Sequence, residues 1–178
     1  AHQIIETQAG DLSAYIPTNV ISITDGQIFL ESELFFSGQR PAVNVGLSVS
    51  RVGGAAQTKA MKKAAGSIRI DLAQYREMEV FTQFSSDLDE GTMKQLQHGR
   101  ALMELLKQPM SHPFSMAEQV IILVSANAHI FSDIELSKIK GFRADMLEFF
   151  HSQHSEIVNT IESTKDLTDE TKEAIIAA

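Results

Sequence analysis

Residues 45–57 read VGLSVSRVGGAAQ, a short apolar pattern that runs into one arginine and then into a pair of glycines. Apolar residues alternate with small polar ones up to Ser50, which is the period of a strand with one buried face. The glycines relax the backbone, and residues 55–63 have the composition of a short helix. We therefore expect Arg51 at a strand-to-helix elbow, a position that presents functional side chains.

The residues before this segment are predicted to form short strands and turns. Asp25 and Gly26 are typical of a hairpin turn, and Pro17 favours an extended loop over residues 15–19. Short strands without a βαβ repeat do not close a domain, so we interpret them as the last strands of a larger sheet. The β-branched stretches that suggest strands are residues 4–5, 20–23 and 28–30.

After residue 55 the apolar period becomes helical, which predicts an α-helical bundle. Capping boxes of the form S-x-x-E begin at Ser115 and Ser132, and Thr168 is placed to cap the last helix. The change of period predicts a boundary between residues 1–65 and 66–178. The expected buried stripes are Ile68, Leu72, Tyr75 and Met78; Leu96, Met103 and Leu106; and Leu136, Ile139, Phe142, Met146 and Phe149.

Charge is distributed unevenly along the chain, whose net charge is -8. No Asp or Glu occurs between Leu34 and Ile70, and this window suits an anionic ligand because no carboxylate opposes its field. A solvated helix face is the preferred interpretation for its lysines, but not for Arg40 and Arg51. Nucleic acid is not expected as a partner, since aromatic residues are not interleaved with the cations. The cations are Arg40, Arg51, Lys59, Lys62, Lys63 and Arg69.

Several kinds of site are excluded by what the sequence lacks. There is no cysteine, no pair of histidines with the spacing of a helical zinc site, and therefore no expected metal site. No glycine-rich P-loop with Lys and Ser or Thr occurs, and no nucleophile has an adjacent base. The longest apolar run, at residues 120–124, is far shorter than the ~20 residues of a membrane span, so direct insertion is not expected. We interpret the chain, which begins at Ala1, as a piece of a longer polypeptide.

The sequence SVSRVGGAAQTKAMK at residues 48–62 resembles the segment that carries the arginine finger in the alpha subunit of the rotary F-type ATP synthase. Further similarity follows in the same order at residues 13–30, 40–44, 71–77 and 105–108. This resemblance implies an α+β fragment. Residues 1–65 would be the closing strands of a RecA-like α/β nucleotide-binding domain without its P-loop part, and residues 66–178 an all-α helical bundle.

The same resemblance implies a role in the catalytic sector of a proton-coupled synthase. Arg51 matches the arginine that reaches from alpha to the phosphate at a beta catalytic site, and Ser22 matches a position near that interface. The alpha subunit also binds ATP or ADP with Mg²⁺ that it does not turn over; Arg40, Pro41 and Gln108 match positions near its adenine. Met110 stands where the family often has a second glutamine.

The implied partners are beta subunits, which alternate with alpha in a hexamer, and the gamma subunit of the central stalk, which the loop at residues 86–90 would face. The implied location is peripheral, on the cytoplasmic face of a bacterial inner membrane or on the matrix or stroma side of an organelle. Alone, the segment is expected to be inactive. The alternatives are a helical protein-interaction module, an alpha-like relative in flagellar or secretion ATPases and, for Arg51 itself, a structural ion pair.

Overall fold

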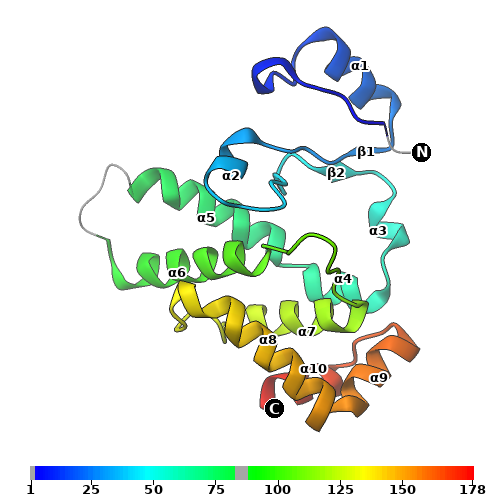
Figure 1. Ribbon diagram of the computed structural model, residues 1–178, viewed down its shortest axis with the longest axis vertical. Helices are drawn as coiled ribbons and strands as arrows, with labels where there is room; N and C mark the ends of the chain where they lie inside the picture. Colours follow the sequence, from blue (N-terminus) through cyan, green and yellow to red (C-terminus); the bar gives the residue numbers. More distant parts are fainter. Residues whose placement is uncertain (1–2, 83–87) are drawn as a thin grey trace. The chain divides into compact units, whose positions relative to one another are not determined.

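The computed structural model of the chain describes residues 3–82 and 88–178 (Figure 1). The chain divides into two compact units, Ala1–Ala56 and Gln57–Ala178. The fold class expected from the sequence, a short strand region followed by a helical bundle, is confirmed.

The first unit combines short helices with a small antiparallel sheet. Strands β1 and β2 pair Gly26 with Ser50 and Gln27 with Val49, and an isolated bridge joins Leu30 to Val43. Its elements are the 3₁₀ helix η1 (Gln8–Gly10), α1 (Tyr15–Ile23), β1 (Gly26–Gln27), α2 (Ser32–Phe36), β2 (Val49–Ser50) and α3 (Gly53–Ala56).

The predicted strand at residues 20–23 and the predicted loop at residues 15–19 are both wrong, because these residues form α1. Pro17 occupies the first turn of that helix, where a backbone N–H has no partner within the helix, so the missing donor costs nothing. The β-branched residues Val20 and Ile21 are accommodated as well, since β propensity is easily overridden by context. A local preference for strand therefore did not decide the structure here.

The predicted hairpin turn at Asp25 and Gly26 is also wrong, because Gly26 begins β1 opposite Ser50. A Cβ atom on Gly26 would lie 2.5 Å from the Val49 carbonyl oxygen, so this glycine is required by the close approach of the two strands. Residues 4–5 lie outside any strand, and of residues 28–30 only Leu30 makes a bridge.

The strand expected before Arg51 is shorter than predicted. Only Val49 and Ser50 pair with β1, and residues 45–47 form a turn. The Leu47 amide donates to Oδ1 of Asn44 at 3.0 Å, and this side-chain contact favours a turn over a continuing strand. The residue that precedes Arg51 is nevertheless in a strand, as the alternating pattern predicted.

The second unit is a bundle whose centre is α7. This helix is apolar around most of its circumference, and Val120, Ile121 and Val124 are fully buried because α7 packs on α4, α8, α9 and α10. Helices α5 and α6 form an antiparallel pair (Figure 1). The elements are α4 (Lys59–Ala65), α5 (Ile68–Thr82), α6 (Glu90–Leu105), α7 (Met116–Asn127), α8 (Leu136–Gln153), α9 (Ser155–Thr164) and α10 (Asp169–Ala177).

Two of the three predicted helix starts are confirmed. The hydroxyl of Ser115 accepts from the Glu118 amide while Glu118 caps the Ser115 amide, and Thr168 accepts from the Thr171 amide. The box predicted at Ser132 is wrong, because α8 begins only at Leu136 and Glu135 is its N-cap residue. The Ser132 hydroxyl instead lies 3.4 Å from Nδ1 of His98 on α6, a contact that no local sequence rule contains.

The predicted apolar stripes are confirmed in part. Ile68, Leu72 and Tyr75 on α5 are buried. On α8 the stripe is misplaced, because Leu136, Phe142 and Phe149 are exposed, and among the members predicted only Ile139 is fully buried. The buried face of α8 consists of Ile139, Arg143, Leu147 and Phe150. No helix in the described part of the chain has both the length and the apolar character needed to cross a bilayer.

Candidate functional site

The elbow around Arg51 is fixed by backbone and side-chain hydrogen bonds. The Arg51 amide donates to the carbonyl of Asp25 at 2.7 Å, next to the first residue pair of the sheet. The Gly53 amide donates to Oγ of Ser50 at 2.8 Å, and α3 begins at Gly53. A Cβ on Gly53 would lie 2.9 Å from that Oγ, so glycine leaves room for this turn. The predicted strand-to-helix elbow is therefore confirmed, but the helix expected over residues 55–63 is divided: α3 ends at Ala56, and α4 begins at Lys59 after the N-cap Thr58.

The Arg51 side chain is exposed, in contrast to its fixed backbone. Among residues 3–82 and 88–178, no carboxylate forms an ion pair with its guanidinium. A permanent positive charge on a constrained stem can meet an anion supplied by another molecule. Ser22, on α1, is exposed too, and its hydroxyl donates within the helix to the Asn19 carbonyl at 2.6 Å.

Arg40 and Pro41 follow α2 in an exposed turn of the first unit. Gly38 has a φ of +89°, in the left-handed region that glycine adopts readily, and the Arg40–Pro41 peptide is cis. The Arg40 guanidinium lies 4.5 Å from the centroid of the Phe35 ring, a cation–π contact that orients the cation. This turn therefore presents the oriented guanidinium of Arg40 next to the exposed side chain of Pro41.

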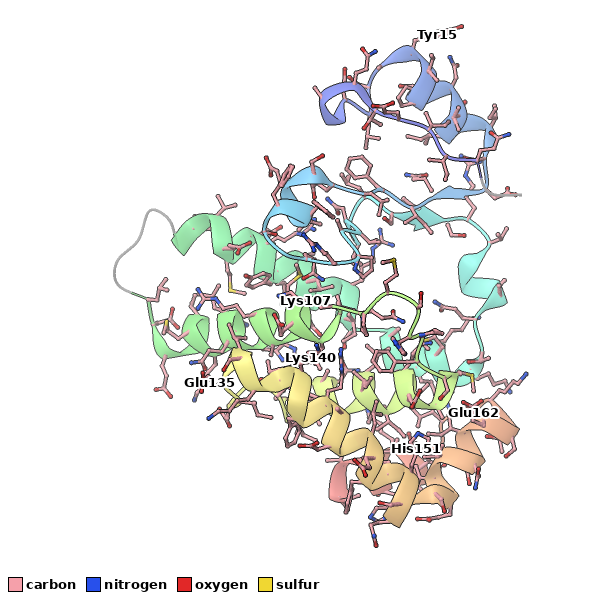
Figure 2. The ribbon with its side chains drawn as sticks, viewed as in Figure 1. Tyr15, Lys107, Glu135, Lys140, His151 and Glu162 are labelled. Carbon is pink, nitrogen blue, oxygen red and sulfur yellow. The ribbon has the colours of Figure 1, made fainter. Side chains whose placement is uncertain are left out.

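Gln108 belongs to the second unit, in the loop between α6 and α7, where it is exposed. Its Nε2 donates to the carbonyl of His112 at 3.3 Å. Met110, in the same loop, is also exposed. Lys107, which precedes Gln108 in this loop, is labelled in Figure 2. The loop thus exposes Gln108, for which the sequence suggested a binding role, and Met110, which stands where the family often has a second glutamine.

Arg143, which contacts the loop between α6 and α7, was not predicted from the sequence to have a role. It lies on the buried face of α8 with an exposed fraction of 5 %, and its Nη1 donates to the carbonyls of Leu105 at 2.8 Å and Lys107 at 3.0 Å. Its guanidinium lies 4.9 Å from the Phe114 ring centroid. The available signal was its position four residues after Ile139, which places a charge on an apolar face.

The basic window is not free of acids in space. Nζ of Lys63 lies 3.1 Å from Oδ1 of Asp166, and it also donates to the carbonyl of Leu167 at 2.5 Å. The bond from Lys63 lowers the pKa of Asp166, with a further contribution from the Leu167 amide. Lys59 and Lys62 are exposed, as the solvated-face interpretation predicted. One lysine of the window, Lys63, is therefore paired with an acid that lies far away in the sequence.

The histidines do not assemble a metal site in the part of the chain that the structure describes, where no cluster of three or more His, Cys, Asp or Glu could hold an ion. His98 packs against the ring of His129 at a centroid distance of 4.2 Å, and its Nε2 lies 3.9 Å from Oδ2 of Asp71. Burial, and then the neighbouring His129, lower the pKa of His98, while Asp71 opposes them. His151, at the C-terminal end of α8, lies 3.1 Å from Oε1 of Glu118.

The predicted acidic turn at residues 86–90 is only partly accessible to description, because Ser86 and Asp87 lie outside the described residues. Asp89 is the N-cap of α6, and its Oδ2 accepts from the Thr92 amide at 3.1 Å. The hydrogen bonds from Thr92 lower the pKa of Asp89. For the described part, the carboxylate is thus explained as complementing a helix N-terminus.

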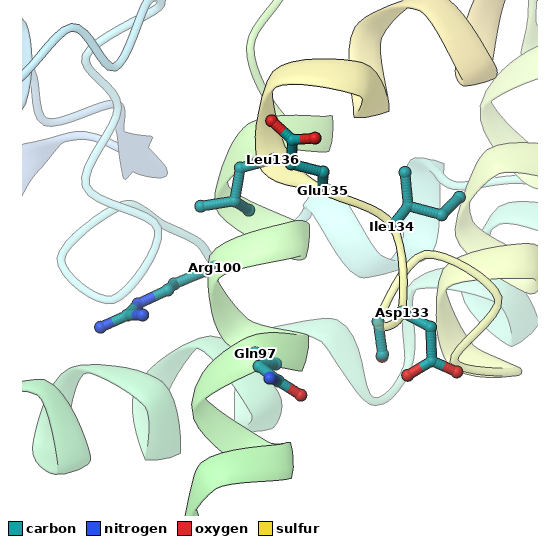
Figure 3. Close-up of a pocket in the computed structure, with 7 residues that line it drawn as sticks. Gln97, Arg100, Asp133, Ile134, Glu135 and Leu136 are labelled. Carbon is teal, nitrogen blue, oxygen red and sulfur yellow. The ribbon is translucent and has the colours of Figure 1, made fainter.

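An open pocket of about 430 Å³ lies between α6 and the segment that leads into α8 (Figure 3). Figure 3 shows Arg100 extending away from Asp133 and Ile134, so the basic and acidic groups do not converge on one point. None of the residues for which the sequence predicted a catalytic or nucleotide-binding role lines this pocket. Its lining residues are Gln97, Arg100, Ser132, Asp133, Ile134, Glu135 and Leu136.

Comparison with known proteins gives matches over nearly the whole chain. Residues 57–178 match the family model of the ATP synthase alpha/beta chain, C terminal domain, and residues 1–50 match the nucleotide-binding domain of the ATP synthase alpha/beta family. Arg51 lies between these two stretches. A curated relative from Caldanaerobacter subterraneus subsp. tengcongensis, ATP synthase subunit alpha, is 56 % identical over 175 residues. That alignment covers 98 % of this chain and 35 % of the relative, so the chain spans about a third of the relative's length.

Proposed function

This chain belongs to the ATP synthase alpha/beta family, and on that premise we propose that it is part of an alpha subunit whose Arg51 serves as an arginine finger for a neighbouring beta subunit. The observation that carries the proposal is the elbow. A backbone pinned to Asp25 holds an exposed guanidinium that has no carboxylate partner in the described ranges. The reverse arrangement, a buried and paired arginine, would have favoured a structural role.

The chemistry follows from the properties of guanidinium. Arginine stays protonated, and its planar fork can donate several hydrogen bonds to phosphoryl oxygens as negative charge develops on them. In nucleotide hydrolases an arginine finger supplied in trans contributes roughly 10³ to 10⁵ in rate. Ser22 is proposed to lie near the same subunit interface. Because the finger comes from another chain, hydrolysis or synthesis at the beta site depends on how the subunits are placed.

We also propose that the subunit holds ATP or ADP with Mg²⁺ that is not turned over. The residues present fit the base end of such a nucleotide: Gln108 offers an exposed amide, which can both donate to and accept from a purine edge. Arg40 and Pro41, in the first unit, are proposed as further contacts to adenine. No P-loop sequence is present to cradle the phosphates, so residues 1–178 are proposed to have no catalytic activity alone.

The proposed partners are beta subunits, arranged alternately with alpha in a hexamer, and the gamma subunit of the central stalk. The complex would couple proton flow to ATP synthesis. The proposed location is peripheral, at the cytoplasmic face of a bacterial inner membrane or at the matrix or stroma face in an organelle. Support for these proposals comes from the similarity to an ATP synthase subunit alpha along 98 % of this chain.

The test replaces Arg51 in the complete alpha chain and assembles it with its beta partner. Arg51→Ala is expected to lower steady-state ATP hydrolysis by about 10³-fold or more, and Arg51→Lys by nearly as much, because a point charge lacks the bidentate fork. Lys62→Ala is the matched control, since it removes an exposed cation from the same basic window. Unchanged turnover in an assembled Arg51→Ala complex would overturn the proposal.

A further inference from the structure

The loop between α6 and α7 is organised around one buried guanidinium. Arg143 reaches it from α8, a helix that begins some thirty residues further along the chain. Its Nη1 donates to the carbonyls of Leu105 and Lys107, just before Gln108, and its guanidinium lies over Phe114, close to the start of α7. A single side chain therefore contacts both ends of the loop.

We propose that Arg143 is a positioning residue, which sets the affinity for the adenine base by fixing the loop that presents Gln108. This inference rests on the proposed role of Gln108 at the base. Arg143 itself is buried and is not proposed to contact the nucleotide. It acts through the backbone on which Gln108 is carried.

The contacts divide the loop into a fixed frame and an adaptable side chain. At the far end, Nε2 of Gln119 donates to the Phe114 carbonyl at 2.9 Å, which adds to the contact made by Arg143. In between, the Gln108 amide makes one long hydrogen bond, at 3.3 Å, to the His112 carbonyl. This bond can be exchanged for one to a ligand at little cost, while the frame holds the Gln108 backbone in place.

Arginine suits this position better than any other residue. The last carbonyls of a helix have no partner within it, and the partial negative charge at the end of α6 favours a cation there. The two N–H groups of Nη1 can reach two carbonyls two residues apart, while the planar guanidinium can also stack on the Phe114 ring. Burial lowers the pKa of Arg143 and Glu104 opposes that shift. The ordinary value lies far above neutrality, so the guanidinium stays charged.

The experiment measures binding of two probes, MgATP and magnesium tripolyphosphate, to the complete polypeptide that carries these residues. Arg143→Gln is expected to lower the affinity for MgATP by about 3- to 10-fold, as Gln108→Ala does, because each costs about one hydrogen bond to the base. The affinity for tripolyphosphate, which has no base, should not change in either variant. Lys140→Gln, an exposed change on the same helix, is the control and should leave both affinities unchanged.

The variants distinguish the positioning role of Arg143 from the proposed role of Gln108 at the base. If Gln108→Ala weakens MgATP but Arg143→Gln does not, Arg143 has no positioning role while the role of Gln108 stands. If neither variant lowers the affinity for MgATP, Gln108 does not contact the base, and the positioning role of Arg143 is excluded as well. If Arg143→Gln lowered the affinity for MgATP and for tripolyphosphate equally, the substitution would act on the whole site and not on the base contact, which would also overturn the inference. Should Arg143→Gln not fold, Arg143→Lys and Phe114→Leu, which each remove part of the clamp, are expected to give smaller losses confined to MgATP.

Discussion

The two units of this chain treat their apolar side chains in opposite ways. In Ala1–Ala56, Ile4, Ile23 and Phe36 have exposed fractions of 98 %, 81 % and 84 %. In Gln57–Ala178, Ile121 and Ile161 are completely buried. A two-stranded sheet is too small to cover a hydrophobic face, whereas helices can surround a central one such as α7. The contrast teaches that the second unit carries its own core, whereas the first leaves large apolar side chains exposed.

The largest effect is expected when the two units are produced as separate polypeptides. A polypeptide of residues 57–178 is expected to keep its helices and to unfold in one cooperative transition, because its core lies within it. A polypeptide of residues 1–56 is expected to show neither. Far-ultraviolet circular dichroism during thermal unfolding measures both, with the whole chain as reference. A cooperative transition in residues 1–56 would contradict the contrast.

Next in size is the truncation of one isoleucine in each unit. Ile121→Ala is expected to lower the free energy of unfolding of the second unit by about 2–5 kcal/mol, since it leaves a cavity in a closed core. Ile23→Ala, at an exposed position of the first unit, should change the free energy of the cooperative unfolding transition of the whole chain by no more than about 0.5 kcal/mol. Urea unfolding gives both values. Equal losses would show that α1 buries Ile23 after all.

A third test uses two glycines of the second unit. A Cβ on Gly99 would lie 2.3 Å from Cδ2 of Tyr75, so Gly99→Ala should force α5 and α6 apart at a cost of about 1–3 kcal/mol. Gly141 on α8 meets nothing within 4 Å of such a Cβ, and Gly141→Ala should stabilise by about 0.5–1 kcal/mol. Changes of opposite sign in the free energy of unfolding, measured in urea, would support tight packing of α5 on α6. A gain from both would show that this contact relaxes freely.

The smallest expected effect is a dependence of second-unit stability on pH. Burial lowers the pKa of His98 below its ordinary value of 6.5, so the unfolded chain binds a proton more readily than the folded one. Stability is therefore expected to fall as the pH decreases through and below 6.5. Urea midpoints measured from pH 8 to pH 5 should show a shallower slope in His98→Gln than in the exposed control His112→Gln. Identical slopes would remove His98 as the cause.

Part of the candidate site could be predicted from the sequence. The strand-to-helix elbow at Arg51 depends on neighbouring residues and was found there, although the strand is shorter than predicted and the helix expected over residues 55–63 is divided into two. Arg143 could not be assigned, because its partners at Leu105, Lys107 and Phe114 are brought to it by the packing of α8 on α6. The pairing of Lys63 with Asp166 was missed for the same reason.

By itself, the sequence determined the features whose hydrogen bonds close within one turn. The caps at Ser115 and Thr168 formed as predicted, and three of the four residues of the α5 stripe are buried, because donor and acceptor, or successive apolar residues, are a few positions apart. The tertiary structure alone decided that Ser132 serves His98 in place of a helix start and that α8 turns Arg143 inward. In these cases contacts between distant residues outweigh local preferences of about 1 kcal/mol or less per residue.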